Sequence, residues 1–352
     1  MFHYKNQLDN TKILNNCTFV KTSLMLMVII YHSCVFWTST WWDTPPVFKS
    51  PVLSYFATWL DSFHIYTFTL VSGYIFAYKR LNGGYKHYGL FLKNKLQRLL
   101  VPYFFVSLIW MIPISYLLFQ LNCGQIIKKY FLGINPEQLW FLWMLFDVFV
   151  IIWPLWKKIF KSSIFCWGIA IAFYCIGVIG KKIFPNVFCI WTAFEFIPLF
   201  CIGIQLRLNE ENLKKQFIFQ IHWFIWLILD LIFFVMSVFL SRQSGIIIQV
   251  LRVGVFFILH IIGAIMAFII LQIWANSVQW KESKVIKLLS TYSMPMYLFH
   301  QQIIYFTIIY FDGRVNPFVH FMINFIIAIF SSFSISMFLM QWKVLRKLLG
   351  ES

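Results

Sequence analysis

A histidine stands inside a segment that is otherwise almost wholly apolar, Val28-Ile29-Ile30-Tyr31-His32. An ionisable side chain at membrane depth costs at least a few kcal/mol, and so it indicates a functional site. The ordinary pKa of imidazole lies near neutrality, so the neutral ring can accept a proton from a hydroxyl group. His32 is therefore a candidate general base. From position alone the alternative stays open that it is a structural histidine bonded to a neighbouring helix.

Lys21 precedes His32 by eleven residues. Eleven residues make about three helical turns, so the two side chains share one helix face about 16 Å apart along the axis. A cation at the membrane boundary, with an imidazole deeper on the same face, suits a long ligand that has an anionic head and a reactive far end. A nucleotide-linked acyl thioester has this shape.

The other ionisable side chains in apolar segments form a short list: Asp61, His64, Asp147, Glu195, Asp230, Arg252, His260 and His300. Asp61 and His64 lie one helical turn apart, so the carboxylate can orient the imidazole, and a structural interhelical pair is the alternative. Glu195 and Arg252 are predicted to form a buried ion pair between two helices. His300 is followed by two glutamines, and we expect it to line a cavity.

The sequence has no pattern typical of a metal site. The histidines are scattered without H-E-x-x-H spacing, and the seven cysteines lie mostly in apolar segments, where they act as small hydrophobic residues. Glycine-rich phosphate loops and a G-x-S-x-G turn are also missing from the sequence, so a hydrolase triad has no support. We predict no metal site.

The composition defines the environment in which these side chains must work. The chain has 352 residues, of which 61% are hydrophobic and 12% charged, about half the charged fraction of a soluble domain. Its mean hydropathy is +0.76. Apolar runs long enough to cross about 30 Å of hydrocarbon recur along the chain. The sequence therefore predicts a membrane-embedded enzyme, transporter or scaffold, and excludes soluble classes, nucleic-acid binding included.

Apolar runs and the breaks between them predict an all-α integral membrane protein with a single transmembrane domain over residues 1–352. We expect about ten transmembrane helices, over residues 18–37, 53–78, 99–121, 137–156, 162–180, 188–207, 217–240, 247–274, 290–311 and 318–341.

Lysine and arginine predict the orientation of these helices. The formal net charge is +17, and most basic residues fall before the first helix, in alternate loops, and after the last helix. Cytoplasmic loops carry this excess, so both termini are predicted to be cytoplasmic, which requires an even number of spans. The segment joining the second and third helices is the most basic and is a candidate docking surface for a polyanion, with ordinary topological bias as the alternative: Lys79, Arg80, Lys86, Lys93, Lys95 and Arg98.

Five stretches occur in the order found in the acyltransferase family 3 of membrane O-acyltransferases, which the chain resembles. The first is Lys21 with His32, where lysine replaces the commoner arginine. The others are similar to the family's Ser-Gly-aromatic, basic-x-x-Arg, Leu-Trp-Phe-Leu and late Tyr-Leu-x-His segments, and they are residues 63–74, 95–103, 139–143 and 292–300.

The resemblance implies that an acyl group, usually acetyl, passes from cytoplasmic acyl-CoA to a sugar hydroxyl. The acceptor would be a cell-envelope polysaccharide, such as a capsule or O-antigen, or its lipid-linked precursor. Acetyl-CoA is thus the expected donor, and the cytoplasmic membrane of a bacterium the expected location. Carried onto this sequence, the resemblance implies that Lys95 and Arg98 hold the phosphates of coenzyme A and that Lys21 assists at the donor site.

His32 would then act as general base or carry the acyl group, while four residues line the substrate cavity: His64, Tyr74, Trp140 and His300. A transporter or polymerase of lipid-linked glycans, working without acyl transfer, is the alternative function. A catalytically inactive scaffold is a third.

Overall fold

The computed structural model describes residues 2–41, 44–210, 222–277 and 283–351, and in these ranges the chain forms helices and no strand. Within these ranges, eight helical segments are long and apolar enough to cross a membrane. They are Ile13–Thr38, Tyr88–Phe119, Glu137–Lys161, Ser163–Ile183, Val187–Leu208, Trp223–Ser241, Ile246–Ser277 and Pro317–Leu339. The prediction of an all-α integral membrane protein is confirmed.

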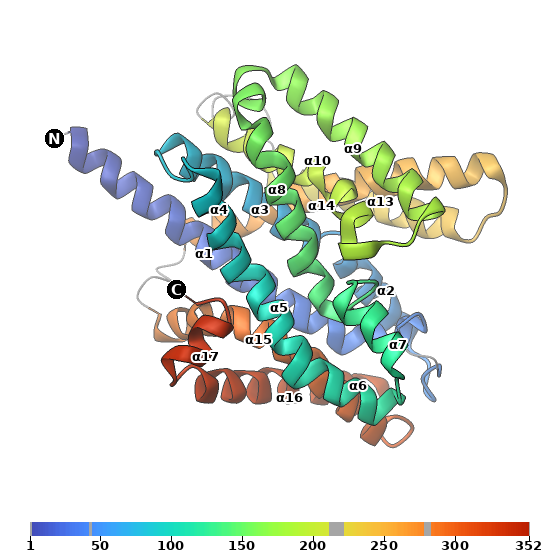
Figure 1. The fold of residues 1–352 in the computed structure, drawn as a ribbon. Helices are drawn as coiled ribbons and strands as arrows, with labels where there is room; N and C mark the ends of the chain where they lie inside the picture. The colour runs from blue at the N-terminus through green and yellow to red at the C-terminus, as the bar shows by residue number, and fades with distance from the viewer. Residues whose placement is uncertain (1, 42–43, 211–221, 278–282, 352) are drawn as a thin grey trace.

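Two further long helices, α3 (His64–Leu81) and α15 (Lys284–Phe311), fall outside these eight. The sequence predicts spans at both places. Both helices carry polar side chains that are buried within the protein, including Thr67 and Thr69 on α3 and the pair Gln301 and Gln302 on α15. Their polar faces pack inward, so they form part of the interior of the bundle (Figure 1).

The single helix predicted over residues 53–78 is divided in the structure. Helix α2 (Pro51–Asp61) ends before α3 begins. The Ser62 hydroxyl donates to the carbonyl of Trp59 at 2.7 Å, and the ring of His64 bonds the carbonyl of Leu60 at 2.6 Å. These side chains satisfy carbonyls at the end of α2 that the next helical turn would otherwise bind, so the chain can turn there.

The third span is continuous but locally widened. It consists of α4 (Tyr88–Lys95), α5 (Val101–Val106) and α6 (Ile112–Phe119), joined by π-helical turns over Leu96–Leu100 and Ser107–Met111. Pro102 and Pro113 follow the two wide turns and lack the amide hydrogen that a regular helix needs there. The span therefore begins eleven residues before the predicted start at 99, and Arg98 lies in its first wide turn.

The remaining long helices follow the predicted order. Residues 217–221, the predicted start of the seventh span, lie outside the described ranges. The bounds of the remaining helices are α1 (Phe2–Cys34), α7 (Cys123–Ile126), α8 (Trp140–Lys161), α9 (Ser163–Ile183), α10 (Ile190–Leu208), α13 (Trp223–Ser241), α14 (Ile246–Ser277), α16 (Pro317–Leu339) and α17 (Lys343–Leu348). The short helices α7 and α17 fall outside the predicted spans.

Two glycines bring α3 and α10 together at the centre of the bundle. A Cβ atom on Gly73 would lie 2.1 Å from the carbonyl oxygen of Phe200, and one on Gly203 would lie 1.9 Å from that of Leu70. In a membrane, helices associate through such close packing, because lipid is as apolar as the helix surface. The close crossing explains the glycine of the Ser72-Gly73 stretch and fixes the wall that carries His64.

The predicted ion pair between Glu195 and Arg252 is wrong. Glu195 instead accepts a hydrogen bond from Lys181 at 2.8 Å, one helix earlier in the chain. Arg252 lies on an exposed part of α14. Lys181 stands at the end of α9, where its long side chain reaches the carboxylate while keeping its ammonium group partly exposed.

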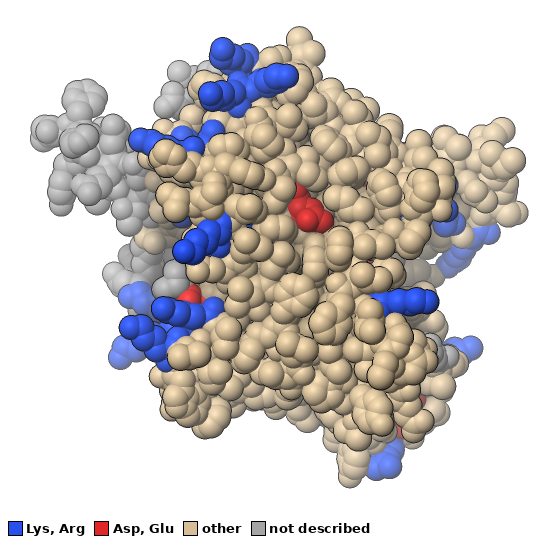
Figure 2. Space-filling model, in the orientation of Figure 1, with Lys and Arg blue, Asp and Glu red and all other residues tan. Residues whose placement is uncertain are grey.

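Helix α1 begins at the same end of the bundle as α17 (Figure 1). Most of the lysine and arginine side chains visible in Figure 2 gather on that side of the molecule. Helix α1 then runs obliquely through the bundle, away from that end (Figure 1). Lys21 lies in the body of α1 and His32 in its last turn, so the two side chains are separated along the helix as the sequence spacing predicts.

Candidate active site

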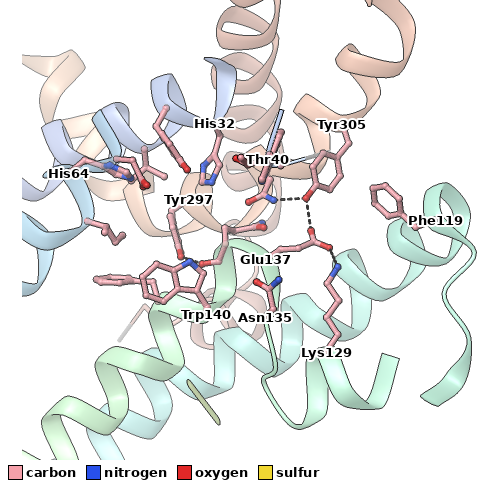
Figure 3. A pocket seen from close by; sticks show the side chains of 18 of the residues that line it. His32, Thr40, His64, Phe119, Lys129, Asn135, Glu137, Trp140, Tyr297 and Tyr305 are labelled. Carbon is pink, nitrogen blue, oxygen red and sulfur yellow. Dashed lines mark hydrogen bonds and ion pairs between the residues drawn. The ribbon is translucent and has the colours of Figure 1, made fainter. Parts of the chain in front are cut away.

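A cavity of about 610 Å³ lies near the end of the bundle opposite α17, and His32 is on its wall (Figure 3). Four parts of the chain line it: the end of α1 with Thr40 and Trp41, the junction of α2 and α3, the connection from α6 to α8, and α15. Residues distant in sequence thus meet around one histidine.

A second histidine orients His32. The Nδ1 atom of His32 lies 2.8 Å from Nε2 of His300, and Nδ1 of His300 lies 2.7 Å from the carbonyl oxygen of Tyr297. A carbonyl only accepts hydrogen bonds, so Nδ1 of His300 carries the proton and its Nε2 is an acceptor. Nδ1 of His32 is then the donor, which leaves the lone pair on its Nε2. This is the tautomer that a general base requires.

Aromatic rings enclose His32. The ring of Trp41 lies 5.7 Å from the imidazole between centroids, and the ring of Tyr31 lies 5.0 Å away. Trp41 in turn contacts Tyr305 at 5.0 Å. Only 9% of His32 is exposed, so a reacting group reaches it through the cavity. Such enclosure limits access of water to the base.

His64 also lines the cavity, as the sequence predicts, but Asp61 does not orient it. Nδ1 of His64 lies 2.6 Å from the carbonyl of Leu60 and therefore donates to it. The Asp61 carboxylate instead lies beside the hydroxyl group of Tyr31. His64 consequently has its Nε2 as an acceptor, like His32, and Asp61 is available to a ligand in the cavity.

Sequence reasoning missed Glu137, the most extensively bonded carboxylate of the cavity. Its Oε1 contacts Nζ of Lys129 at 2.5 Å and accepts from the hydroxyl of Tyr130 at 3.0 Å. Its Oε2 accepts from Gln302 at 2.8 Å. It also accepts from Tyr305 at 3.0 Å (Figure 3). An acidic residue at the start of a predicted helix is ordinary, so nothing in the sequence marked it. Its backbone is left-handed (φ 51°), which marks it as held in place by its surroundings.

Gln138 also connects the segment before α8 to α15. Its side-chain amide donates to Gln302 at 2.8 Å and to the carbonyl of Leu298 at 3.1 Å. The hydroxyl of Tyr297 donates back to the carbonyl of Gln138. Together with the bonds of Glu137, these contacts fix the rotation of α15, the helix that presents His300 to His32.

Four basic side chains gather toward the other end of the bundle, and we call them the basic cluster: Lys21, Lys79, Lys95 and Arg98. Their charges are close enough to interact with one another. The ammonium group of Lys95 lies 3.5 Å from the centroid of the Phe149 ring, an attraction that holds a cation in an apolar site. Arg98 is exposed. The structure thus brings together the three cations predicted for the donor site and adds Lys79.

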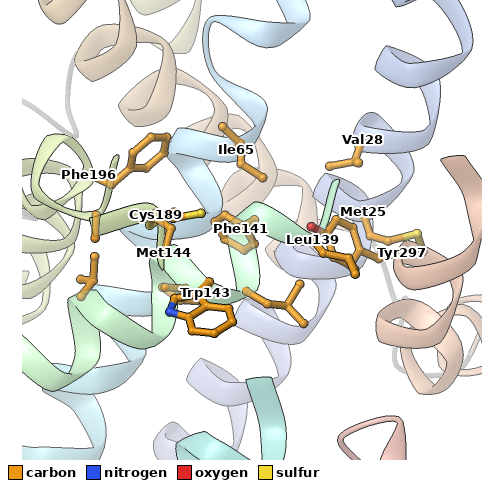
Figure 4. Packing of buried hydrophobic residues seen from close by; sticks show 14 of the residues in the cluster. Met25, Val28, Ile65, Leu139, Phe141, Trp143, Met144, Cys189, Phe196 and Tyr297 are labelled. Atoms are coloured by element: carbon orange, nitrogen blue, oxygen red, sulfur yellow. The ribbon is translucent and has the colours of Figure 1, made fainter. Parts of the chain in front are cut away.

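Packed apolar side chains separate the basic cluster from the cavity. Met25 and Val28 lie on the face of α1 that joins Lys21 to His32, and they are 2% and 1% exposed. Val28 and Phe141 form part of the cavity wall, and Met25 lies in the same buried cluster (Figure 4). A ligand that bridges the two ends must displace these side chains.

The two aromatic residues predicted for the cavity lie in different places. Trp140 lines the cavity. Tyr74 lies in a separate apolar cluster with Cys17 and Val20, and its hydroxyl donates to Glu210 at 2.8 Å. The prediction that His300 lines the cavity is wrong: it is absent from the cavity wall and is fully buried against His32. In the described part of the chain, no group of three or more His, Cys, Asp or Glu residues is arranged to hold a metal ion.

Comparison with known families identifies the class of protein to which this chain belongs. The family model for acyltransferase family 3, described as an acyltransferase domain, matches residues 17–340, nearly the whole chain. The chain belongs to this family, as the ordered stretches in its sequence predict. It is therefore a multi-pass membrane acyltransferase. No curated protein and no solved structure matches it.

Proposed function

We propose that this protein is an O-acyltransferase that moves an acyl group, acetyl being the expected one, from acyl-CoA to a sugar hydroxyl. The acceptor is a cell-envelope polysaccharide, such as a capsule or O-antigen, or its lipid-linked precursor. The observation that carries the proposal is the bonded pair of His32 and His300, since it leaves a proton-accepting nitrogen at a cavity in a family of acyltransferases.

In the proposed reaction, Nε2 of His32 accepts the proton of the acceptor hydroxyl as its oxygen attacks the thioester carbonyl carbon. The new carbon–oxygen bond replaces the carbon–sulfur bond, and the thiolate of coenzyme A leaves with the electron pair of that bond. His32 returns its proton to the thiolate. His300 stabilises the protonated His32 by accepting from its Nδ1, much as a third residue orients the base in a catalytic triad.

The basic cluster supports binding of the donor. Phosphate groups are held by cations, with lysine acting as a point charge and arginine as a planar fork. Lys21 and His32 share one face about 16 Å apart, a separation that a long thioester arm can span. Binding of the phosphates at one end would therefore aim the reactive thioester at His32.

The proposed orientation has both termini in the cytoplasm of a bacterium and the cavity toward the other side of its cytoplasmic membrane. It rests on the positive-inside bias and on the gathering of basic side chains at the end where α1 begins. The donor then enters from the cytoplasm and the acceptor from the opposite face. Family membership favours acyl transfer over the alternative of a glycan carrier or polymerase.

Purified protein incubated with labelled acetyl-CoA tests the proposal. We expect release of coenzyme A thiol and transfer of label to envelope glycan, and each should depend on the other substrate. Glycan movement or polymerisation without label transfer would support the alternative function. Comparison of envelope glycans with and without the gene, for loss of O-acetyl signals, tests the same conclusion in cells.

A further inference from the structure

The cavity that holds His32 has an uneven charge. Among the described residues on its wall are two carboxylates, Asp61 and Glu137, and one ammonium group, Lys129. Lys129 lies 2.5 Å from Glu137, so these two charges neutralise each other. Asp61 has the neutral hydroxyl of Tyr31 beside it. With neutral histidines and an ionised Asp61, the described residues of the wall therefore carry a net negative charge, which belongs to Asp61.

Asp61 lies on the wall of the cavity that also holds His32. It is the last residue of α2, and its side chain is exposed on the cavity side. Tyr31 precedes His32 in the chain, and its ring lies 5.0 Å from His32 and 4.8 Å from His64. The Asp61 carboxylate therefore shares the cavity wall with Tyr31, the residue that precedes His32 in the chain. A carboxylate has about four lone-pair positions, so it can accept further hydrogen bonds.

We infer that Asp61 binds the acceptor sugar and selects neutral or amino sugars over sugars that carry a carboxylate, sulfate or phosphate group. This inference rests on the proposed function and names the class of its acceptor. Sugar hydroxyl groups donate to a carboxylate, and an ammonium group forms an ion pair with it. An anionic sugar would place a second negative charge beside Asp61, and the paired Lys129 does not offset it.

Trp41 supplies the second contact that a sugar needs. Its ring lies 5.7 Å from the His32 ring and is tilted by 31° to it. An aromatic face packs against the apolar C–H face of a pyranose, and it also attracts an ammonium group. Trp41 and Asp61 both line the cavity that contains His32. The three residues together define a subsite for one neutral or amino sugar with its reacting hydroxyl toward His32.

The experiment uses labelled acetyl-CoA and the total envelope glycan of cells that produce the full chain. The acylated sugar residue is identified by mass spectrometry and NMR of the labelled glycan. We expect the label on a neutral or amino sugar. Label on a uronic acid, sialic acid or phosphorylated sugar would overturn the inference and leave the proposed function standing. Absence of any label on glycan would instead overturn the proposed function, and the inference with it.

Asp61→Asn tests the residue itself. We expect the KM for glycan to rise at least about tenfold, while the KM for acetyl-CoA stays within about twofold of wild type. Asp61→Glu should restore part of the acceptor affinity, which distinguishes a lost contact from a misfolded protein. Asp312→Asn is the matched control, because Asp312 binds the backbone of Val47 at an exposed site. An unchanged KM for glycan in folded Asp61→Asn protein would overturn the inference.

Discussion

Nδ1 of His32 lies 2.8 Å from Nε2 of His300, although the two residues are 268 positions apart in the chain. The carbonyl of Tyr297 fixes the tautomer of His300, and His300 fixes that of His32. The family's first and last sequence stretches therefore meet in one hydrogen-bonded pair. This contact indicates that His300, which the sequence predicts on the cavity wall, positions His32.

His32→Ala should abolish glycan acylation, with a loss in kcat of at least about a thousandfold, because it removes the proposed base. His300→Ala should lower kcat about a hundredfold and leave both KM values near wild type, since it only orients His32. Steady-state assays with labelled acetyl-CoA measure both effects. His300→Gln, which can accept from His32, should recover activity. A His300→Ala enzyme with wild-type kcat would contradict the positioning role.

Glu137→Gln should destabilise the protein by about 1–3 kcal/mol, because it leaves Lys129 without its ionic partner and disturbs the bonds to Tyr130 and Tyr305. Lys129 is 26% exposed, which limits the cost. Thermal unfolding in detergent measures the change. Glu195→Gln is the matched control: its pair with Lys181 is more exposed and should cost less than about 1 kcal/mol. Equal losses in the two variants would contradict a special role for Glu137.

Arg98→Ala should raise the KM for acetyl-CoA about tenfold or more and change kcat less, since Arg98 is proposed to bind phosphate rather than to act in the chemical step. Steady-state kinetics with varied donor measure both constants, and added salt should weaken donor binding in the wild type. Lys93→Ala is the control, because Lys93 is exposed on the neighbouring turn of α4 and interacts with none of the basic cluster in the described contacts. A variant that loses kcat and keeps its KM would argue against phosphate binding.

Gly203→Ala should destabilise the fold by about 1–3 kcal/mol, because its Cβ would collide with the carbonyl of Leu70 and push α3 from α10. Gly168→Ala meets no atom within 4 Å and should be neutral or slightly stabilising, since alanine favours helix. The yield of monodisperse protein and its unfolding temperature compare the two. Equal unfolding temperatures of the two variants would contradict the close packing of α3 against α10.

Much of the fold follows from sequence because the bilayer restricts the choices. Lipid offers no hydrogen bonds to the backbone, so a long apolar run has to be a helix, and its length locates it. The prediction of one continuous helix over residues 53–78 was wrong at its middle. The helix is interrupted there because two side chains, Ser62 and His64, bind carbonyls of the preceding turn. A hydropathy profile does not report whether a side chain competes with the backbone for these carbonyls. The prediction of an ion pair between Glu195 and Arg252 was wrong because the order of helices in the chain does not determine which of their faces are in contact.

Helical periodicity acts within a single element, so the sequence alone places Lys21 and His32 on one face of the first helix. The structure puts His32 in the last turn of α1, near the end of the span rather than at its middle. The resemblance to the family also selected the cations Lys21, Lys95 and Arg98 for the proposed donor site, and the last two share a short segment. Three relationships appear only in the folded chain: His300 orients His32, Glu137 bonds to α15, and the Asp61 carboxylate lies beside Tyr31 instead of His64. Those contacts join residues from different helices, and the rotation and crossing of helices depend on packing between them, which no single segment encodes.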